Sequence, residues 1–465
     1  MTMPPPAPGQ LLHIRPGPPT GAQPQPPGSK YLTLRSVLAA FLAGGESLVR
    51  HPARSDDTNV LLAAIRALGA EHAWLPAAPG EAGETTLRVR GCAGQPRQPA
   101  GDTLSVGNAG AVLRLLLGIG ALLPTIRFKT PYPDSLGRRP NADLLAALGE
   151  LGIASTAREP GGLLPITLRG GPPRGGVVHV SGARSSQYLS ALLYLAPLLP
   201  DGLRITVTDG LRSAPLVRAT LGALARAGIA VAATGDLRAF TIPGGQPYRA
   251  DVYDVPGDGP SAAALVGAAL ALRAPLRLER LDLAADDVCA LHDALAALGI
   301  ALTHEAHLPD EVELSALVLS PGAGPFRGAT TKSVTIDGDA CIDSVPALVA
   351  IACFAPGTTR FERVGTLRLK ESDRIGDLCA ELTRAGCELT GEADAITVRG
   401  HPQGIPGGVT VSAHQDHRLA QALAIAALHS RAGLTISGAE HVAKSYPHFF
   451  SDLAAMGAMV EPVDG

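Results

Sequence analysis

The sequence contains few aromatic residues and few cysteines, and it has no long hydrophobic run. Phe, Trp and Tyr together make up 3% of the 465 residues, and the formal net charge is -3 at pH 7. Proteins that bind nucleic acid normally have a basic face or stripe, so this balance argues against that class. The longest apolar runs, residues 189–199 and 345–355, are too short to span a bilayer, and Arg114 interrupts the run around it.

Cysteine is scarce and scattered. The six thiols form no CxxC pair, fall at no Cys/His spacing typical of a metal site, and suggest no disulfide framework. We therefore predict reduced, mostly buried thiols, no metal and no other cofactor. The Pro-rich N-terminus lacks the basic-then-apolar order of a signal peptide, which indicates a cytoplasmic protein.

The residues that are present suit a soluble globular protein of two or three domains, with 46% hydrophobic and 17% charged residues. Proline keeps most of residues 1–27 extended, and we predict a disordered tail over residues 1–9. In this segment only Leu11 to Ile14 has the composition of a strand. A helix is predicted from Thr33 to Ala43, ending at Gly44 and Gly45.

One pattern recurs along the whole chain: an apolar-periodic helix ends at a glycine and passes directly into a strand-like segment. The glycine suits a left-handed helix cap, and segments such as Ile229 to Ala232 and Ile300 to Thr303 suit strands. Copies separated by about 70 to 90 residues indicate a repeated supersecondary unit. The six glycines are Gly69, Gly152, Gly228, Gly299, Gly386 and Gly457.

Six units divide naturally into two lobes of three. The boundary is expected in Tyr253 to Pro260, which is rich in Gly, Pro and Asp, so residues 28–253 would form the first lobe and residues 254–465 most of the second. Ligands of two-lobed proteins usually bind between the lobes. We therefore expect functional residues in both halves of the chain.

The densest group of charges is Thr366 to Arg374, where Arg368, Lys370, Glu371 and Arg374 precede a helical pattern. Arg can bind a carboxylate or phosphate with two donors, and Lys adds a point charge. The alternative is a solvated turn with local ion pairs. The surrounding motifs must decide between these interpretations.

In the first half, three turns before helices are candidate anion sites. Lys30 follows Gly28 and Ser29, with Arg35 one turn later; the GxxxxGK[ST] spacing of a P-loop is absent, and an ordinary solvated Lys is the alternative. The segment Gly107-Asn108-Ala109-Gly110 exposes backbone N–H groups, although such turns are common. Arg138 and Arg139 precede a helix predicted to start at Pro140.

Ser185, Ser186 and Gln187 precede the apolar helix of residues 189–199, where they can cap the helix or bind a phosphate ester or sugar hydroxyl. No nearby His or acid would activate either serine, so a serine nucleophile is rejected. In the second half, Asp343 precedes an apolar helix, as Asp337 and Asp339 do, and suits either a cap or a general base.

Near the C-terminus, Asp416-His417-Arg418 opens another apolar helix, and Lys444-Ser445-Tyr446-Pro447 follows. His417 suits a core histidine, whereas Arg418 is harder to bury without an anion. The cations of all these motifs have few acids among them, which indicates a site for small polyanions. They are Lys30, Arg35, Arg139, Lys370, Arg374, Arg418 and Lys444.

In chain order, these motifs resemble the 5-enolpyruvylshikimate-3-phosphate (EPSP) synthase family, over about residues 28 to 460. The matching motifs are Gly-Ser-Lys…Arg, Gly-Asn-Ala-Gly, Arg-Pro, Ser-Ser-Gln-Tyr, Leu-Lys-Glu-Ser-Asp-Arg, Asp-His-Arg and Lys-Ser-Tyr-Pro. The resemblance implies an inside-out α/β barrel in each of two lobes, each built from three βαβαββ units. It also implies that residues 10–27 belong to the second lobe.

The resemblance implies transfer of the enolpyruvyl group of phosphoenolpyruvate to the 5-hydroxyl of 3-phosphoshikimate, with release of phosphate, in the shikimate pathway to chorismate and aromatic amino acids. Residues that look like contacts to 3-phosphoshikimate are Lys30, Arg35, Ser185, Ser186, Gln187, Ser213, Asp343 and Lys370. Those that look like contacts to phosphoenolpyruvate are Lys30, Asn108, Gly110, Arg139, Gln187, Arg374, Arg418 and Lys444.

In this mechanism Asp343 is the candidate base for the hydroxyl, and Glu371 with Lys30 or Lys444 are candidates for proton transfer at the methylene. The resemblance also implies a monomer that acts on small molecules, with lobe closure to exclude water. Retention of Gly110 predicts inhibition by glyphosate, because a bulkier side chain there would crowd that inhibitor.

Four residues depart from the family pattern, mostly around the shikimate ring. They are Tyr31, Ala111, Leu216 and Thr366, where Ser, Thr, Tyr and Asn are usual. One alternative is therefore an enolpyruvyl transferase or eliminase that acts on a related cyclic hydroxy acid. The other is a non-catalytic anion-binding protein, which the joint presence of Asp343, Glu371 and the cations disfavours.

Overall fold

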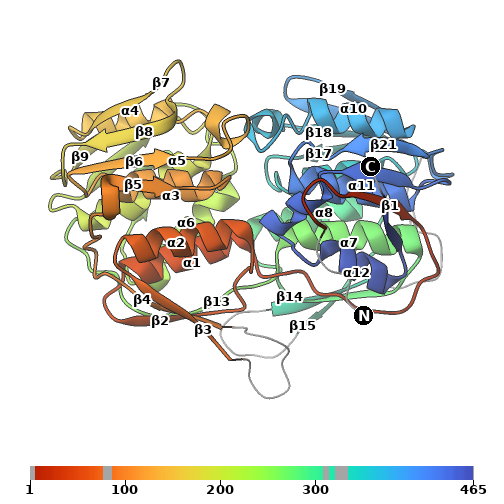
Figure 1. The fold of residues 1–465 in the computed structure, drawn as a ribbon, viewed down its shortest axis with the longest axis horizontal. Helices are drawn as coiled ribbons and strands as arrows, with labels where there is room; N and C mark the ends of the chain where they lie inside the picture. Colours follow the sequence, from red (N-terminus) through yellow and green to blue (C-terminus); the bar gives the residue numbers. More distant parts are fainter. Residues whose placement is uncertain (1–5, 77–85, 307–313, 320–332, 464–465) are drawn as a thin grey trace. The chain divides into compact units, whose positions relative to one another are not determined.

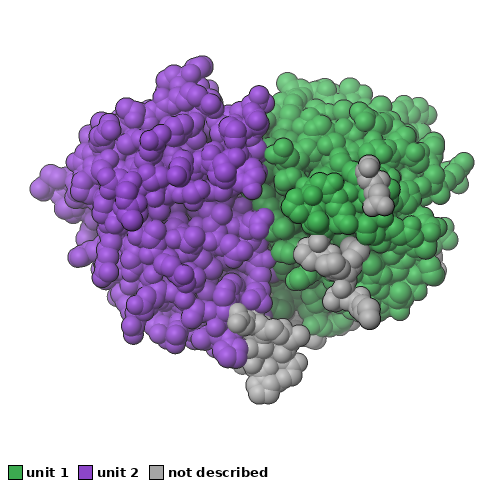
Figure 2. Space-filling model, viewed as in Figure 1, with its two compact units in different colours: residues 1–27, 256–465 green, residues 28–255 purple. Residues whose placement is uncertain are grey.

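The computed structural model describes residues 6–76, 86–306, 314–319 and 333–463 (Figure 1). Contacts between residues divide the chain into two compact units, coloured separately in Figure 2. Unit 2 is Gly28–Val255, and unit 1 combines Met1–Pro27 with Pro256–Gly465. Residues 1–5 of the predicted disordered tail lie outside the described residues.

Unit 2 contains three sheets with one topology. In each, the first strand runs parallel to the second, and the remaining two strands add antiparallel. The sheets are β13-β2-β4-β3 (Val252–Asp254, Glu46–Arg50, Thr86–Arg90, Glu71–Leu75), β5-β6-β8-β7 (Thr103–Ser105, Thr125–Lys129, Leu163–Arg169, Ala154–Arg158) and β9-β10-β12-β11 (Gly176–Val180, Leu203–Val207, Ala239–Ile242, Ala232–Ala233). The helices are α1 (Lys30–Leu42), α2 (Asp56–Ala67), α3 (Gly110–Gly120), α4 (Ala142–Glu150), α5 (Ser186–Leu195) and α6 (Ala214–Arg226).

Unit 1 repeats the topology in two of its sheets. Its sheets are β14-β16-β15 (Leu276–Asp282, Leu314–Leu319, Thr303–Ala306), β17-β18-β20-β19 (Val334–Asp337, Thr358–Glu362, Ala395–Arg399, Glu388–Gly391) and β21-β22-β1-β23 (Val409–Ser412, Leu434–Ser437, Leu11–Arg15, Met459–Val463). The helices are α7 (Gly259–Leu272), α8 (Asp286–Ala297), α9 (Val345–Ala352), α10 (Gly376–Ala385), α11 (His417–Leu428) and α12 (Phe449–Met456). The strand predicted at Leu11 to Ile14 is confirmed as β1.

The predicted helix-glycine-strand pattern is confirmed at all six positions. The six glycines have φ values of +104°, +84°, +77°, +82°, +107° and +113°, in the left-handed region that favours glycine. The strands after Gly228 and Gly299 begin at Ala232 and Thr303, later than predicted. The backbone N–H groups of Ile229 and Ile300 donate to the helix carbonyls of Leu224 and Leu295 and close a Schellman cap, as the residues after the other four glycines also do.

Three helices in each unit are buried almost completely: α1, α3 and α5 in unit 2, and α7, α9 and α11 in unit 1. Glycine allows close packing between them. A Cβ on Gly118 of α3 would lie 2.6 Å from the carbonyl oxygen of Ala191 on α5. A Cβ on Gly267 of α7 would lie 2.7 Å from Cδ1 of Ile425 on α11. None of the helices in the described residues combines the length and apolarity needed to cross a membrane.

The predicted helix over Thr33 to Ala43 is confirmed as α1, which starts earlier, at Lys30, because Ser29 caps it by accepting from the backbone N–H of Leu32. The helix predicted from Pro140 starts at Ala142, with Asn141 in the cap position. All six cysteines are free, as predicted, but only Cys341, Cys353 and Cys387 are buried. Burial raises the pKa of Cys341 to about 12, so this thiol stays neutral.

Candidate active site

Arg374 of unit 1 is the centre of a buried cluster of charges. Its Nε and Nη2 bind both oxygens of Asp416, at 2.7 and 3.1 Å. Nη2 also donates to Glu371 Oε2 at 2.7 Å, and Nη1 donates to Asp343 Oδ1 at 3.1 Å. Burial alone would lower the pKa of Arg374, but Asp416, Glu371 and Asp343 raise it above its usual range. The guanidinium therefore stays charged inside the protein.

Asp416 organises the start of α11. It is completely buried, and its Oδ1 caps the helix by accepting from the backbone N–H of Arg418 at 2.8 Å. Ser372 Oγ donates to the other oxygen at 3.2 Å. Sequence reasoning gave Asp416 no role of its own, although an Asp directly before a helix is a recognisable cap signal. The structure makes it the residue that fixes the guanidinium of Arg374.

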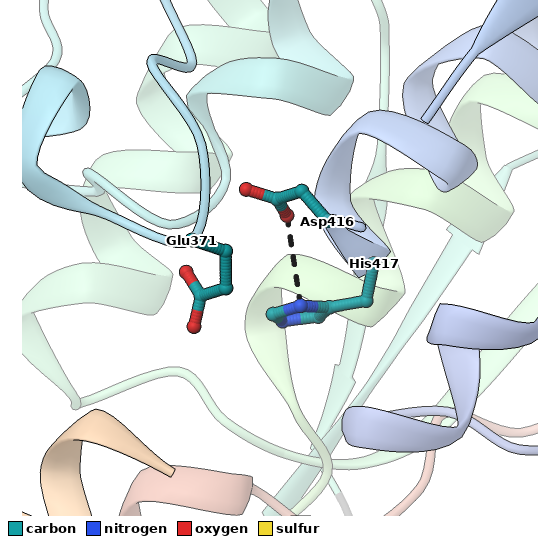
Figure 3. A group of neighbouring side chains, drawn as sticks. All are labelled: Glu371, Asp416 and His417. Atoms are coloured by element: carbon teal, nitrogen blue, oxygen red, sulfur yellow. Dashed lines mark ion pairs between the residues drawn. The ribbon is translucent and has the colours of Figure 1, made fainter. Parts of the chain in front are cut away.

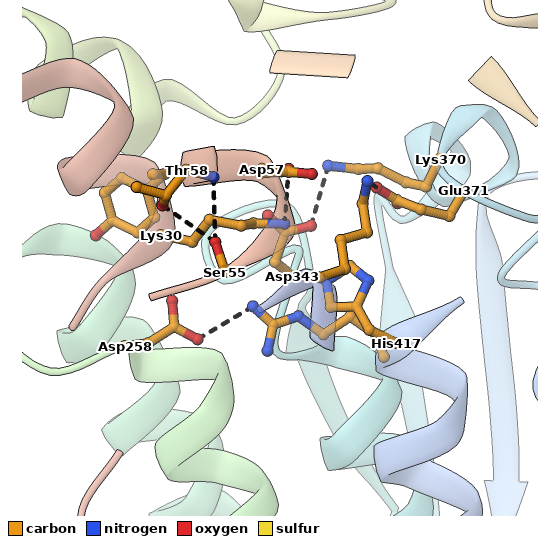
Figure 4. A network of polar contacts seen from close by, with 12 residues as sticks. Lys30, Ser55, Asp57, Thr58, Asp258, Asp343, Lys370, Glu371 and His417 are labelled. Carbon is orange, nitrogen blue, oxygen red and sulfur yellow. Dashed lines mark hydrogen bonds and ion pairs between the residues drawn. The ribbon is translucent and has the colours of Figure 1, made fainter. Parts of the chain in front are cut away.

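Asp343 joins this cluster from the turn before α9. Its Oδ1 accepts from Lys370 Nζ at 3.1 Å as well as from Arg374, and Figure 4 shows Lys370 pointing at this carboxylate. The two acids that precede it have other partners, because Asp337 and Asp339 both pair with Arg363. Of the three acids, the one predicted as the general base is thus the one beside Lys370 and Arg374.

Arg418 and Lys444 complete the set in unit 1. Arg418 is buried, and its Nη2 donates to Asp258 Oδ2 at 3.1 Å; Asp258 in turn caps α7. Lys444 Nζ lies 3.7 Å from Glu371 Oε1, so Glu371 stands between Lys444 and Arg374. A carboxylate with two cationic neighbours can exchange a proton with one while the other holds it in place.

Glu371, Asp416 and His417 have ligand atoms within 4.8 Å of one another and could in principle hold a metal ion (Figure 3). The guanidinium of Arg374 already binds both carboxylates at 2.7 Å. A divalent cation would therefore have to compete with a fixed positive charge at the same oxygens. The chemistry of this cluster suits an ion-pair network rather than a metal site.

In unit 2, Lys30 lies in the first turn of α1 with its Nζ 3.6 Å from Asp57 Oδ2 (Figure 4). Ser55 caps the helix that contains Asp57 by accepting from the backbone N–H of Thr58. The ammonium group is mostly buried, with 16% of the side chain exposed. Lys30 is thus a sheltered cation in the first turn of a helix, and its role in binding an anion stays a prediction.

Gly110, Arg139 and Gln187 gather around a further arginine. Gly110 is the first residue of α3, and a Cβ built on it would lie 2.6 Å from Arg139 Nη1 and 3.6 Å from Arg114 Nη1. Arg114 Nη1 donates to Gln187 Oε1 at 2.7 Å. Sequence analysis noted Arg114 only as a break in an apolar run. A lone Arg one helical turn after Gly110 was the signal that could have identified it.

The three serines predicted to contact 3-phosphoshikimate lie at helix starts of unit 2. Ser185 caps α5 by accepting from the backbone N–H of Gln187, so the capping interpretation holds for this residue. Ser213 occupies the cap position of α6 with a left-handed backbone, φ +55°. Ser186 and Ser213 are both buried. These positions bring polar side chains to the ends of two helices of the same unit.

Arg35 has contacts that tie α1 to α6. Its Nε donates to Thr220 Oγ1 at 2.8 Å, and its Nη groups donate at 3.0 Å to the carbonyls of Tyr31 and Leu216. Its guanidinium also lies 5.6 Å from the centre of the Tyr31 ring. These contacts favour a structural role for Arg35, and its assignment to a substrate phosphate stays a prediction.

The prediction that the site has few acids among its cations was wrong. Buried cations need counter-charges when no substrate anion is bound. The pairs are Lys30 with Asp57, Lys370 with Asp343, Arg374 with Asp416 and Glu371, Arg418 with Asp258, and Lys444 with Glu371.

With this geometry in hand, comparison with known proteins identifies the family. The family model described as EPSP synthase (3-phosphoshikimate 1-carboxyvinyltransferase) matches residues 16–453. The chain belongs to the EPSP synthase family. The resemblance stated from the motifs is confirmed.

Individual members of the EPSP synthase family are similar over nearly their whole length. The 3-phosphoshikimate 1-carboxyvinyltransferase of Deinococcus radiodurans is 42% identical over 442 residues, covering 93% of this chain and 92% of that protein. The enzyme of that name from Burkholderia pseudomallei is 33% identical, covering 94% and 92%. A solved EPSP synthase from Acinetobacter baumannii is 25% identical with a TM-score of 0.77, covering 97% of this chain and 100% of that one.

Another solved structure is similar to this chain in its fold alone. The enolpyruvyl transferase NikO from Streptomyces tendae has a TM-score of 0.74 at 19% sequence identity, covering 98% of this chain and 99% of that one. The mixed α/β architecture of repeated sheets is therefore the architecture of EPSP synthase structures.

Proposed function

We propose that the chain transfers the enolpyruvyl group of phosphoenolpyruvate to the 5-hydroxyl of 3-phosphoshikimate and releases phosphate. The observation that supports this best is Asp343, a carboxylate held by Lys370 and Arg374 inside a chain that matches the family over residues 16–453. The two cations hold Asp343 where it can accept the hydroxyl proton, and Glu371 is close enough to Arg374 to belong to the same site.

The ion pairs suggest how 3-phosphoshikimate would activate the base. Lys370 Nζ donates to Asp343 Oδ1 at 3.1 Å. A phosphate dianion competes for an ammonium group more strongly than a single carboxylate oxygen does. We infer that binding of the substrate phosphate draws Lys370 away and leaves Asp343 held by Arg374 alone, ready to take the hydroxyl proton.

The phosphoenolpyruvate side is assigned to the cations and donors that sequence analysis predicted. Attack of the hydroxyl and protonation of the methylene give a tetrahedral intermediate with a methyl group. Removal of a proton from that methyl group then restores the C=CH₂ double bond and expels phosphate. Fixed positive groups would stabilise the charge on the leaving phosphate. Glu371 is the candidate proton donor to the methylene, and Lys444, whose Nζ lies 3.7 Å from Glu371 Oε1, would then return a proton to it. Lys30 is the other candidate donor. The proposed donor-side contacts are Lys30, Asn108, Gly110, Arg139, Gln187, Arg374, Arg418 and Lys444.

The acceptor-side proposal comprises Lys30, Arg35, Ser185, Ser186, Gln187, Ser213, Asp343 and Lys370. A related cyclic hydroxy acid is the second candidate acceptor, because Tyr31 and Leu216 both lie against Arg35, where the family usually has other side chains. Phosphorus NMR of purified protein with phosphoenolpyruvate and 3-phosphoshikimate decides between the two. The enolpyruvyl product with free phosphate supports the proposal, and unchanged substrates with folded protein refute it.

We also propose that units 2 and 1 correspond to the two inside-out barrels of the family, and that substrate binding closes them. The enzyme would act as a cytoplasmic monomer on small molecules, without a cofactor. Light scattering measures the mass, and small-angle X-ray scattering with both substrates measures closure. A mass of one chain and a smaller radius of gyration with substrates are expected; an unchanged radius would contradict closure.

A further inference from the structure

Arg114 is a charged residue inside an otherwise apolar helix. It lies on α3 (Gly110–Gly120) and is 6% exposed, among neighbours such as Leu113 and Leu115 that are fully or nearly fully buried. Burial of a guanidinium costs free energy unless its donors find acceptors. The partners of Arg114 therefore indicate why the helix contains it.

One side of the guanidinium is anchored to the segment before α4. Nε donates to Asn141 Oδ1 and Nη2 to the carbonyl of Pro140, both at 3.4 Å, and the ring of Tyr188 lies 5.4 Å away. Asn141 is itself completely buried, and its amide donates to the carbonyl of Arg139 at 2.9 Å. The same rigid segment thus positions both Arg114 and Arg139.

The other side of the guanidinium binds Gln187 Oε1 through Nη1 at 2.7 Å. Arg has donors only, so the amide oxygen of Gln187 must face it, and the amide NH₂ must point elsewhere. Gln187 is only partly buried, unlike Arg114. An amide fixed in this way offers N–H donors, rather than an acceptor, to an anion.

We infer that Arg114 is a positioning residue that locks the amide of Gln187 with its donor side toward the substrates. This inference rests on the proposed role of Gln187 in binding phosphoenolpyruvate and 3-phosphoshikimate. Without Arg114 the amide can rotate, and its oxygen would then face an anion for part of the time. The expected result is weaker binding of both anionic substrates, without loss of the groups that transfer protons.

A double-mutant cycle tests the inference through Arg114→Met, Gln187→Met and the double variant. We expect each single variant to lower the affinity for phosphoenolpyruvate and kcat/KM by about 10- to 100-fold, as for a lost hydrogen bond to a charged group. The double variant should be no more than about twofold worse than Gln187→Met, because Arg114 acts through that residue. Effects that multiply in the double variant would overturn the inference.

Two further variants separate positioning from general structural damage. Gln187→Glu keeps an acceptor for Arg114 but removes the donor, so its affinity for phosphoenolpyruvate should fall at least as far as that of Gln187→Met. Arg114→Lys keeps the charge and one donor, so it should recover part of the loss; a Lys variant equal to Met would contradict the inference. If Arg114→Met fails to fold, the Lys and Glu variants measured by equilibrium binding carry the same test.

Arg226→Met is the matched control, because Arg226 pairs on the surface of the same unit with Asp251 and the carbonyl of Val252. Its binding and turnover should stay within about twofold of the wild type. Binding by calorimetry is measured for every variant alongside turnover. Wild-type protein that binds both substrates without turnover would refute the proposed reaction but leave the cycle decisive, whereas wild-type protein that binds neither would overturn both.

Discussion

The two units hold several of their buried arginines in different ways. In unit 1, Arg374 is held by three carboxylates, one of which also pairs with Lys444, and Arg418 pairs with a fourth acid, Asp258. In unit 2, Arg114 and Arg35 donate to neutral amide, hydroxyl and carbonyl oxygens. A cation with carboxylate neighbours can take part in proton transfer, whereas one held by neutral oxygens keeps its net positive charge for an anion. The comparison predicts that the carboxylates of unit 1 can move protons beside the cations they hold, whereas Arg114 and Arg35 of unit 2 act as fixed positive groups. Lys30 of unit 2, which pairs with Asp57, follows the pattern of unit 1.

The largest effect is expected from Asp343→Asn, which removes the proposed base from unit 1 without changing its shape. Loss of a general base should lower kcat by about 10²- to 10⁴-fold. Phosphate release at saturating substrates measures it. Asp337→Asn is the control, since Asp337 pairs with Arg363 instead. Equal activity of the two variants would show that Asp343 is not the general base.

Asp416→Asn weakens the support of Arg374 and is expected to have the next largest effect. Removal of one partner from a buried ion pair costs about 3 to 5 kcal/mol of unfolding free energy. Chemical denaturation measures the change. Glu461→Gln is the control, because its pair with Arg15 is exposed and should contribute less than about 1 kcal/mol. Similar losses of unfolding free energy in both variants would show that the buried ion pairs around Arg374 stabilise the fold no more than an exposed pair does.

Gly110→Ala tests the anion-binding side in unit 2. The added Cβ would lie 2.6 Å from Arg139 Nη1, the movable end of a long side chain, so the fold should survive while Arg139 shifts. We expect KM for phosphoenolpyruvate to rise about 10-fold, equivalent to about 1.4 kcal/mol. Inhibition by glyphosate should weaken at the same time.

Gly149→Ala provides the matched control for that substitution. Gly149 also lies in a helix of unit 2, and a Cβ there would have nothing within 4 Å. This variant should keep the wild-type KM and gain up to about 1 kcal/mol of stability from helix propensity. An unchanged KM in Gly110→Ala, or wild-type activity that persists at millimolar glyphosate, would contradict the assignment.

The smallest effect on stability at neutral pH is expected for His429, a side chain whose surroundings keep it uncharged. His429 of unit 1 stacks on Phe354, with ring centres 3.9 Å apart, and burial lowers its pKa to about 3. Unfolded His titrates near 6.5, so the folded form is the weaker proton acceptor. Stability is therefore complete above about pH 6.5 and falls as the pH drops toward 3.

His429→Leu should reduce that acid dependence by a few kcal/mol between pH 7 and 4, with little change above pH 7. Urea unfolding at several pH values measures it, and His401→Gln, at an exposed site, is the control. If the wild type and His429→Leu lose stability in parallel, the burial of neutral His429 does not contribute.

The repeated unit could be predicted because its signal is local. Each helix end, capping glycine and following strand occupy a short run of sequence, and all six were found. The partners of β1 could not be read from pattern in this way, since His13 lies beside Thr435, 422 residues later in the chain. Pairing over such a separation leaves no periodicity in the sequence, and the resemblance to the family implied only that residues 10–27 belong to the second lobe.

The candidate site likewise has residues that local sequence patterns could predict and residues that they could not. Cations at helix starts were predicted because turns and caps have residue signatures. The acidic partners Asp343 and Glu371 were predicted as well, but Asp57 and Asp258 were missed, since they come from other elements and counter-charges within a fold cannot be located by spacing. Arg114 was missed for a simpler reason: inside an apolar helix it was interpreted only as an interruption.

The position of β1 also has a consequence for the order in which the chain is made. Unit 2 has all its strands once β13, at Val252–Asp254, has been synthesised, so it can fold while the rest of the chain is still being translated. Leu11–Arg15, made near the start, must wait for β22 and β23, which end at Val463. The first strand to leave the ribosome is therefore among the last to find its place, and until then its two future neighbours lack the strand that joins them.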